Sequence, residues 1–381
     1  MIRHQIGLLR LSGSVQKKIL ALLDATEKDV ADAVKRRLKR GLSVSSQQAT
    51  INAIKGIRSK AWEKSATVWR DEMRALAQAE PEFLSTALKT VAPVTLDLVI
   101  PSIATLNAIV VKSPFEGKVL KEWAKSVAAA DIARLEQQIR IGVTQGESAA
   151  LIARRLVGSV QQGGRNGATE ITRQNAAAIT RTAINGISNQ AKRAFYVANS
   201  DLFSEELYVA TLDARTTPIC QSLDGKFFPI GKGPIPPLHF NCRSLRVASL
   251  NGEAIGTRPM NASTRRQLLG EYTKGKSFTA ATRDALPRGH KTAFDTFARQ
   301  RVRELTGVVD AKVTYQEFLT RQSTAFQNEV LGPTRGKLFR SGGLPLTKFV
   351  NRQGDELTLA QLASSDKNAF IKAGLNPEDF R

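Results

Sequence analysis

The stretch Leu212–Leu245, LDARTTPICQSLDGKFFPIGKGPIPPLHFNCRSL, decides how the chain around it is organised. It contains both cysteines of the protein and one of its three histidines. Because glycine and proline interrupt helices and favour turns, the stretch is predicted to be a compact, turn-rich module rather than a long helix. Cys220, His239 and Cys242 are therefore expected to converge on one point.

A zinc site is one interpretation of this cluster. Cys220, His239 and Cys242 offer three of the four nitrogen or sulfur ligands that a structural zinc ion uses, and Asp213 or a water molecule would be the fourth. A metal ion would also explain how a module with little core stays folded. Alternatively, the two thiols are buried as small apolar groups and His239 hydrogen-bonds a backbone carbonyl.

Four short motifs occur in and before this module: Arg181-Thr-Ala-Ile-Asn185, Asp213-Ala-Arg215-Thr216 followed by Cys220, Asp224-Gly225, and Pro236-Pro237-Leu-His239-Phe-Asn-Cys242-Arg243. In this order and at these spacings they resemble the phage Mu F-like head-morphogenesis family, over about residues 180–250. The motif residues are Arg181, Asn185, Asp213, Arg215, Thr216, Asp224, Gly225, Pro237 and Arg243. Where many family members carry cysteine, this chain has Thr217 and Ser244, which argues against a four-cysteine metal site.

The resemblance implies a minor capsid protein that is not an enzyme. Its expected partners are the portal or the major capsid protein, in several copies per virion. Its expected function is to assist head assembly, DNA packaging or ejection. Its expected location is the phage head, and the host cytoplasm during assembly. The module is expected to anchor the chain, through some of its apolar side chains (Phe227, Phe228, Ile230, Leu238 and Phe240), unless these only fill the module's own core.

A Cys–His hydrolase is the alternative enzymatic interpretation. Cys220 or Cys242 would be the nucleophile, His239 the base, and Asp213 or Asp224 the group that orients the imidazole. However, neither cysteine lies in a nucleophile-elbow pattern, and a turn-rich loop brings such residues close for other reasons.

The charge is strongly positive, with a formal net charge of +22. The excess lies on both flanks, at +14 in residues 1–200 and +8 in residues 251–381, while residues 201–250 are neutral. Such a surface attracts polyanions, so sequence-independent DNA binding, with a structural zinc module, is an alternative function. The candidate contacts are Lys35, Arg36, Arg37, Lys39 and Arg40. A solvated helix end with favourable dipole interactions explains this run equally simply.

The rest of the chain predicts a mostly helical α+β protein. Three regions are expected: a helical N-terminal domain (1–160), the phage Mu F-like domain (168–250) and a segmented C-terminal region (251–381). The apolar runs are too short for a membrane segment. Two cysteines in 381 residues argue for a reducing cytosol rather than a disulfide framework.

Apolar spacing also predicts individual elements. Helices are expected over Ser14–Arg40, over Ser46–Ala79 with a break at Glu80-Pro81, over residues 114–141 and over Ala168–Asn199. Residues 94–111 are compatible with a strand or a buried helix. Short strands are expected at residues 206–211, 227–228 and 244–248, and short helices after residue 251. Trp62 and Trp69, seven residues apart, should share one buried stripe.

Overall fold

The computed structural model describes residues 4–39, 43–91, 96–159, 166–249 and 257–380. The chain forms two compact units. We call residues 4–199 with 235–242 the helical unit, and residues 200–234 with 243–380 the mixed unit. The described residues are mostly helical and contain two small antiparallel sheets, so the predicted α+β class is confirmed. Within the described ranges, no helix is long and apolar enough to cross a bilayer.

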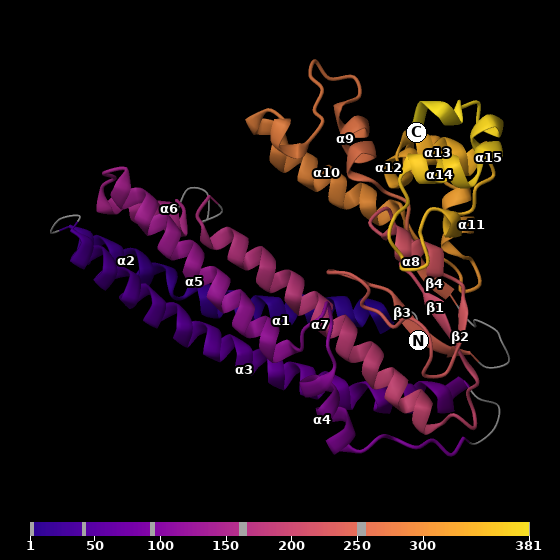
Figure 1. The fold of residues 1–381 in the computed structure, drawn as a ribbon, viewed down its shortest axis with the longest axis horizontal. Coiled ribbons are helices and arrows are strands. Elements are labelled where there is room, and N and C mark those ends of the chain that lie inside the picture. The colour runs from indigo at the N-terminus through magenta and orange to yellow at the C-terminus, as the bar shows by residue number, and fades with distance from the viewer. Residues whose placement is uncertain (1–3, 40–42, 92–95, 160–165, 250–256, 381) are drawn as a thin grey trace. The chain divides into compact units, whose positions relative to one another are not determined.

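The helical unit is built around one long helix, α3, against which α1, α2, α4, α5 and α7 pack (Figure 1). Its helices are α1 (His4–Asp24), α2 (Glu27–Leu38), α3 (Val44–Val91), α4 (Ile103–Lys112), α5 (Leu120–Thr144), α6 (Ala149–Val157) and α7 (Thr169–Ala198). The predicted tryptophan stripe is confirmed: Trp62 and Trp69 are buried, with ring centroids 6.0 Å apart.

A buried carboxylate ties three of these helices together. Asp131 of α5 accepts hydrogen bonds from Arg58 Nε at 2.7 Å and Trp62 Nε1 at 2.8 Å, both on α3. Thr172 Oγ1 of α7 donates to its other oxygen at 2.7 Å. Since the partners satisfy the buried charge, the contact fixes how the helices pack rather than exposing a reactive group.

Two predicted helices differ from the observed ones. The expected helix over Ser14–Arg40 is divided between α1 and α2, with a turn at Ala25 and Thr26. The expected break at Pro81 does not occur, because Pro81 lies inside α3. Proline costs a helix about 3 kcal/mol, and we attribute the continuity of α3 to its packing against five neighbouring helices along its length. Part of the uncertain 94–111 stretch forms α4, while residues 94 and 95 lie outside the described residues.

The mixed unit contains both sheets. The first has the order β2-β1-β3, with β1 (Glu205–Val209) antiparallel to β2 (Phe227–Pro229) and β3 (Leu245–Ser249). The second pairs β4 (Thr257–Asn261) with β5 (Thr306–Asp310). The α-helices of the unit are α8 (Pro218–Leu223), α9 (Arg265–Thr273), α10 (Lys291–Glu304), α11 (Tyr315–Thr320), α12 (Thr324–Leu331), α13 (Pro333–Arg340), α14 (Leu359–Ser365) and α15 (Lys367–Lys372). Its 3-10 helices are η2 (Arg283–Ala285), η3 (Arg288–His290), η4 (Leu346–Lys348) and η5 (Pro377–Phe380).

The C-terminal helices share a core that the sequence pattern did not indicate. Buried Tyr315, Phe318, Leu338 and Phe370 come from α11, α13 and α15. Helix α7 packs against α1, α3 and α5 within the helical unit. The division of the chain into three regions stays a prediction.

Candidate functional site

The carboxylate of Asp224, which is fully buried, joins distant segments of the mixed unit. Its Oδ1 accepts hydrogen bonds from the Ala210 backbone N–H at 2.6 Å and from Arg258 Nη2 at 2.9 Å. Its Oδ2 accepts from Arg258 Nη1 at 3.0 Å and from the Tyr315 backbone N–H at 2.5 Å. One motif residue therefore connects the end of β1, the strand β4 and the start of α11.

The backbone conformation and the close packing at position 225 both favour glycine. The Gly225 φ of +81° lies in the left-handed region, where side chains other than glycine are strained. A Cβ at this position would also lie 2.8 Å from Thr314 Cγ2, which is too close. Its N–H donates to Tyr208 O at 3.0 Å and closes the turn after α8. The Asp-Gly motif is thus a structural junction.

Asp213 forms a second junction with Arg243. The guanidinium of Arg243 donates to both carboxylate oxygens, to Oδ2 through Nη1 and to Oδ1 through Nη2 at 2.8 Å. Burial disfavours the charged carboxylate, but the Arg243 hydrogen bond and charge outweigh it and lower the pKa of Asp213. The hydroxyl of Tyr315 donates to Asp213 O at 2.8 Å. Burial raises the pKa of that hydroxyl, so it stays protonated.

The structure brings together the three predicted sulfur and nitrogen ligands. One ligand atom each from Cys220, His239 and Cys242 lies within 4.8 Å of the others. Neither cysteine is in a disulfide, and both are buried. His239 Nδ1 lies 2.9 Å from Phe240 O, and since a carbonyl only accepts, Nδ1 carries the proton in this contact. That tautomer places the lone pair on Nε2, as is usual for a metal-binding histidine.

Asp213 does not belong to this group, because its oxygens are engaged by Arg243. The hydrogen bonds of Asp213 and Asp224 run to arginines, backbone groups and the Thr216 hydroxyl. Neither aspartate therefore orients His239 as the hydrolase interpretation required. The donors present fit three ligands of a tetrahedral zinc site, with the fourth position supplied from outside these residues.

Helix α7 explains the upstream motif, because it holds the Pro-Pro-x-His segment in place. Thr182 Oγ1 accepts from the Asn241 backbone N–H at 2.9 Å. Gly186 leaves room for Pro237, whose Cδ would lie 3.1 Å from an added Cβ. Trp123 of α5 meets Phe240 edge-on at 5.1 Å between centroids. Sequence reasoning missed Thr182, Gly186 and Trp123, since these contacts join residues far apart in the chain.

The remaining motif residues have separate environments. Asn185 is buried and accepts from Gln5 Nε2 at 3.3 Å, whereas Arg181 is half-buried on the same helix. Thr216 is buried and donates to Thr211 O, closing the turn that precedes α8. The side chain of Arg215 is 80% exposed. The motif thus consists mostly of framework residues with one exposed cation.

The basic run at the end of α2 is exposed, as a phosphate contact requires. Lys35, Arg36, Arg37 and Lys39 are all exposed, and Arg40 lies outside the described residues. The first three occupy the last turn of the helix, where cations also interact favourably with the helix dipole. Exposure here is compatible with both interpretations of the run.

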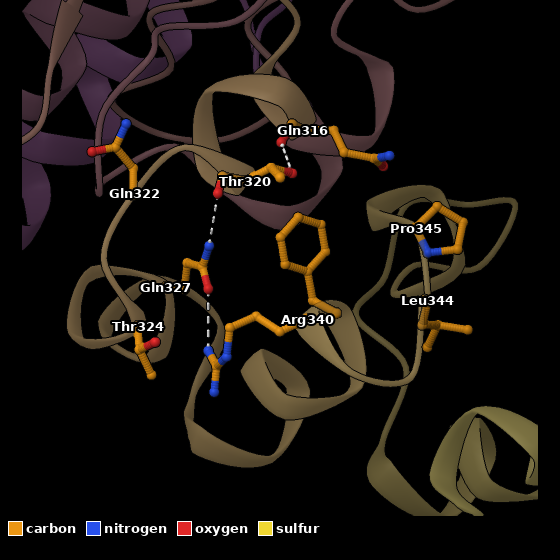
Figure 2. A pocket seen from close by; sticks show the side chains of 10 residues that line it. Gln316, Thr320, Gln322, Thr324, Gln327, Arg340, Leu344 and Pro345 are labelled. Atoms are coloured by element: carbon orange, nitrogen blue, oxygen red, sulfur yellow. Dashed lines mark hydrogen bonds between the residues drawn. The ribbon is translucent and has the colours of Figure 1, made fainter. Parts of the chain in front are cut away.

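A polar pocket of about 430 Å³ lies in the C-terminal part of the mixed unit (Figure 2). It is lined by Gln316, Thr320, Gln322, Thr324, Gln327, Phe339, Arg340, Gly343, Leu344 and Pro345. Figure 2 shows Gln327 between Thr320 and Arg340; its amide donates to Thr320 O at 3.4 Å and its oxygen accepts from Arg340 at 3.3 Å. Arg340 is the one charged side chain in this lining, and these contacts fix the pocket wall.

Comparison with known proteins agrees with the motif analysis. The sequence model of the family described as Phage Mu protein F like protein matches residues 133–246. The matched segment runs from within α5 to the start of β3, and so includes α7, both junction aspartates and Cys220, His239 and Cys242. Searches of curated proteins and of solved structures gave no significant match.

Proposed function

We propose that this chain, whose residues 133–246 carry the phage Mu F-like pattern, is a minor head protein of a tailed phage. It acts in the assembly of the head, bound to the portal or to the inner capsid surface, and assists DNA packaging or ejection. The observation that carries the proposal is the coincidence of the family match with the framework around Asp213, Asp224 and α7. The matched residues with described contacts serve mainly to shape a rigid module, which suits a structural component of a virion.

The docking surface is proposed to include the exposed apolar side chains of that module. Phe227 lies on the edge strand β2 and is 38% exposed, whereas Phe228 and Ile230 are half-buried. Phe240 is 37% exposed although it packs on Trp123. Exposed aromatic residues are enriched in the centres of protein interfaces.

Replacement of Phe227 by Ser should weaken binding of the full chain to assembled portal rings by tenfold or more, measured by co-sedimentation. Val308→Ser on β5 is the matched control, because Val308 is also apolar and is 54% exposed. Equal binding by both variants and the unaltered chain would remove Phe227 from the interface. The full chain is required, because Asp224 is bonded to Arg258 and Tyr315, which lie outside residues 168–250.

A structural zinc ion is the second proposal, held by Cys220, His239 and Cys242. The protein purified without chelator should contain about one zinc per chain, measured by elemental mass spectrometry. Both His239→Ala and Cys242→Ser should lose the metal and lower the melting temperature. His290→Ala should keep it, because His290 contacts Tyr272 instead. Unaltered protein free of zinc would reduce the group to packed thiols and a hydrogen-bonded imidazole.

A further inference from the structure

Residues 263–305 form an arm of the mixed unit with its own small core. We call this segment, which includes α9, η2, η3 and α10, the α9–α10 arm (Figure 1). Its core contains buried Leu268, Leu269, Tyr272, Leu286 and Phe294. Tyr272 packs edge-on against Phe294, with centroids 5.4 Å apart. Because the apolar side chains are used internally, the outer surface of the arm is set by its polar residues.

The arm holds ten Lys and Arg residues against four Asp and Glu residues. Two arginines pair with all four acids: Arg283 with Asp284 and Asp295, and Arg301 with Glu271 and Glu304. Among the residues that the structure describes, none of the other eight cations forms a salt bridge with a carboxylate. Those eight are Arg265, Arg266, Lys274, Lys276, Arg288, Lys291, Arg299 and Arg303. Seven of them are exposed, and Lys291 is half-buried.

Three of these cations, Lys291, Arg299 and Arg303, lie on α10. The spacing of Lys291, Asp295, Arg299 and Arg303 places them on one stripe about 18 Å long, since a helix rises about 1.5 Å per residue. The negative charge of Asp295, the single acid in this stripe, is compensated by arginine. A hydrogen bond from Arg283 lowers the pKa of Asp295, and the charges of Arg299 and Arg265 act in the same direction. The charges of three arginines thus act on one carboxylate, which leaves a local positive excess.

We infer that the α9–α10 arm binds the phosphate backbone of double-stranded DNA without sequence selectivity. Arginine predominates among its cations, and the guanidinium group matches phosphate geometry better than an ammonium does. Within residues 263–305, all of which the structure describes, no large hydrophobic side chain is exposed. A protein-docking surface would need such anchors at its centre, whereas a phosphate-binding surface does not. The inference rests on the proposed function only for its setting beside the packaged genome.

The test compares two variants that each lose four positive charges. In the arm variant, Arg265, Arg266, Arg299 and Arg303 are replaced by Gln. In the control variant, Lys35, Arg36, Arg37 and Lys39 of α2 are replaced by Gln. The readout is the affinity of the purified full chain for a short labelled duplex of mixed sequence, measured by fluorescence anisotropy over a salt series. Coincident unfolding transitions of the variants and the unaltered chain show that folding is retained.

We expect the arm variant to bind at least tenfold more weakly, and the control to bind as the unaltered chain does. The dependence of log affinity on log salt should become shallower by about 3 to 4 in the arm variant, because each lost phosphate contact removes about 0.9. Unchanged DNA affinity of the arm variant would overturn the inference, as would an equal loss in the control. An arm variant that binds DNA normally but no longer binds portal rings would assign the arm to an acidic protein surface instead. Because this assay needs no virion, its outcome is separate from that of the head assignment.

Discussion

Replacing Asp224 with Asn is expected to lower the free energy of unfolding by about 3–5 kcal/mol, one of the largest effects of any single substitution in this chain. The substitution removes the charge that compensates Arg258, whose side chain is only 3% exposed. It also places an amide N–H₂ among groups that all donate, namely Arg258 and the backbone N–H groups of Ala210 and Tyr315. A buried cation and unsatisfied donors are both costly. Urea denaturation followed by circular dichroism measures the change.

The matched control for this prediction is Asp284→Asn, because Asp284 also pairs with an arginine but is 88% exposed. It should leave the denaturation midpoint unchanged. A double variant, Asp224→Asn with Arg258→Met, should recover part of the lost stability, since it no longer buries an uncompensated charge. If Asp224→Asn behaves like Asp284→Asn, or if the double variant is the least stable, Asp224 is not the junction of the mixed unit.

The local features of the fold could be predicted from the sequence. The helix α7, the strands β1 to β3 and the turn at Gly225 all follow from short-range patterns of apolar, glycine and proline residues. The convergence of Cys220, His239 and Cys242 was predicted from their place in one turn-rich module, and the structure brings them together.

The tertiary partners could not be predicted in this way. Asp213 was a candidate zinc ligand because a carboxylate near cysteines suits a metal, but its oxygens are bonded to Arg243, 30 residues away in sequence. Asp224 reaches Tyr315 across 91 residues. No local pattern distinguishes a carboxylate that binds a metal from one that binds an arginine. The choice depends on which chain segments the fold brings together.

Propensity rules failed where packing was stronger. Pro81 indicated a helix end, yet α3 continues to Val91 with Leu84 and Leu88 buried beyond the proline. The sequence indicates a cationic surface at Lys35–Arg40, because the basic residues there are nearly consecutive. In the α9–α10 arm the cations are spread over a segment of 43 residues. The sequence does not show that all four acids pair with only two arginines, which leaves the other eight cations without a salt bridge in the described residues.

The prediction that bears most directly on function is that the protein is a component of the phage particle. A head component has to co-purify with the capsid through every separation, because it is bound to the shell or the portal rather than retained by chance. With a net charge of +22, the protein could also remain with the particles by adsorbing non-specifically to DNA. The particles must therefore be washed at high salt, which weakens such binding. Emptied heads, from which the DNA has been released and digested, provide the matched control.

Quantitative mass spectrometry of salt-washed particles and of DNA-free heads tests the assignment most directly. We expect the protein in both, at a fixed ratio to the portal protein that does not change when the DNA is removed. A protein that is abundant in infected cells but absent from DNA-free heads would contradict its assignment as a structural component of the phage head.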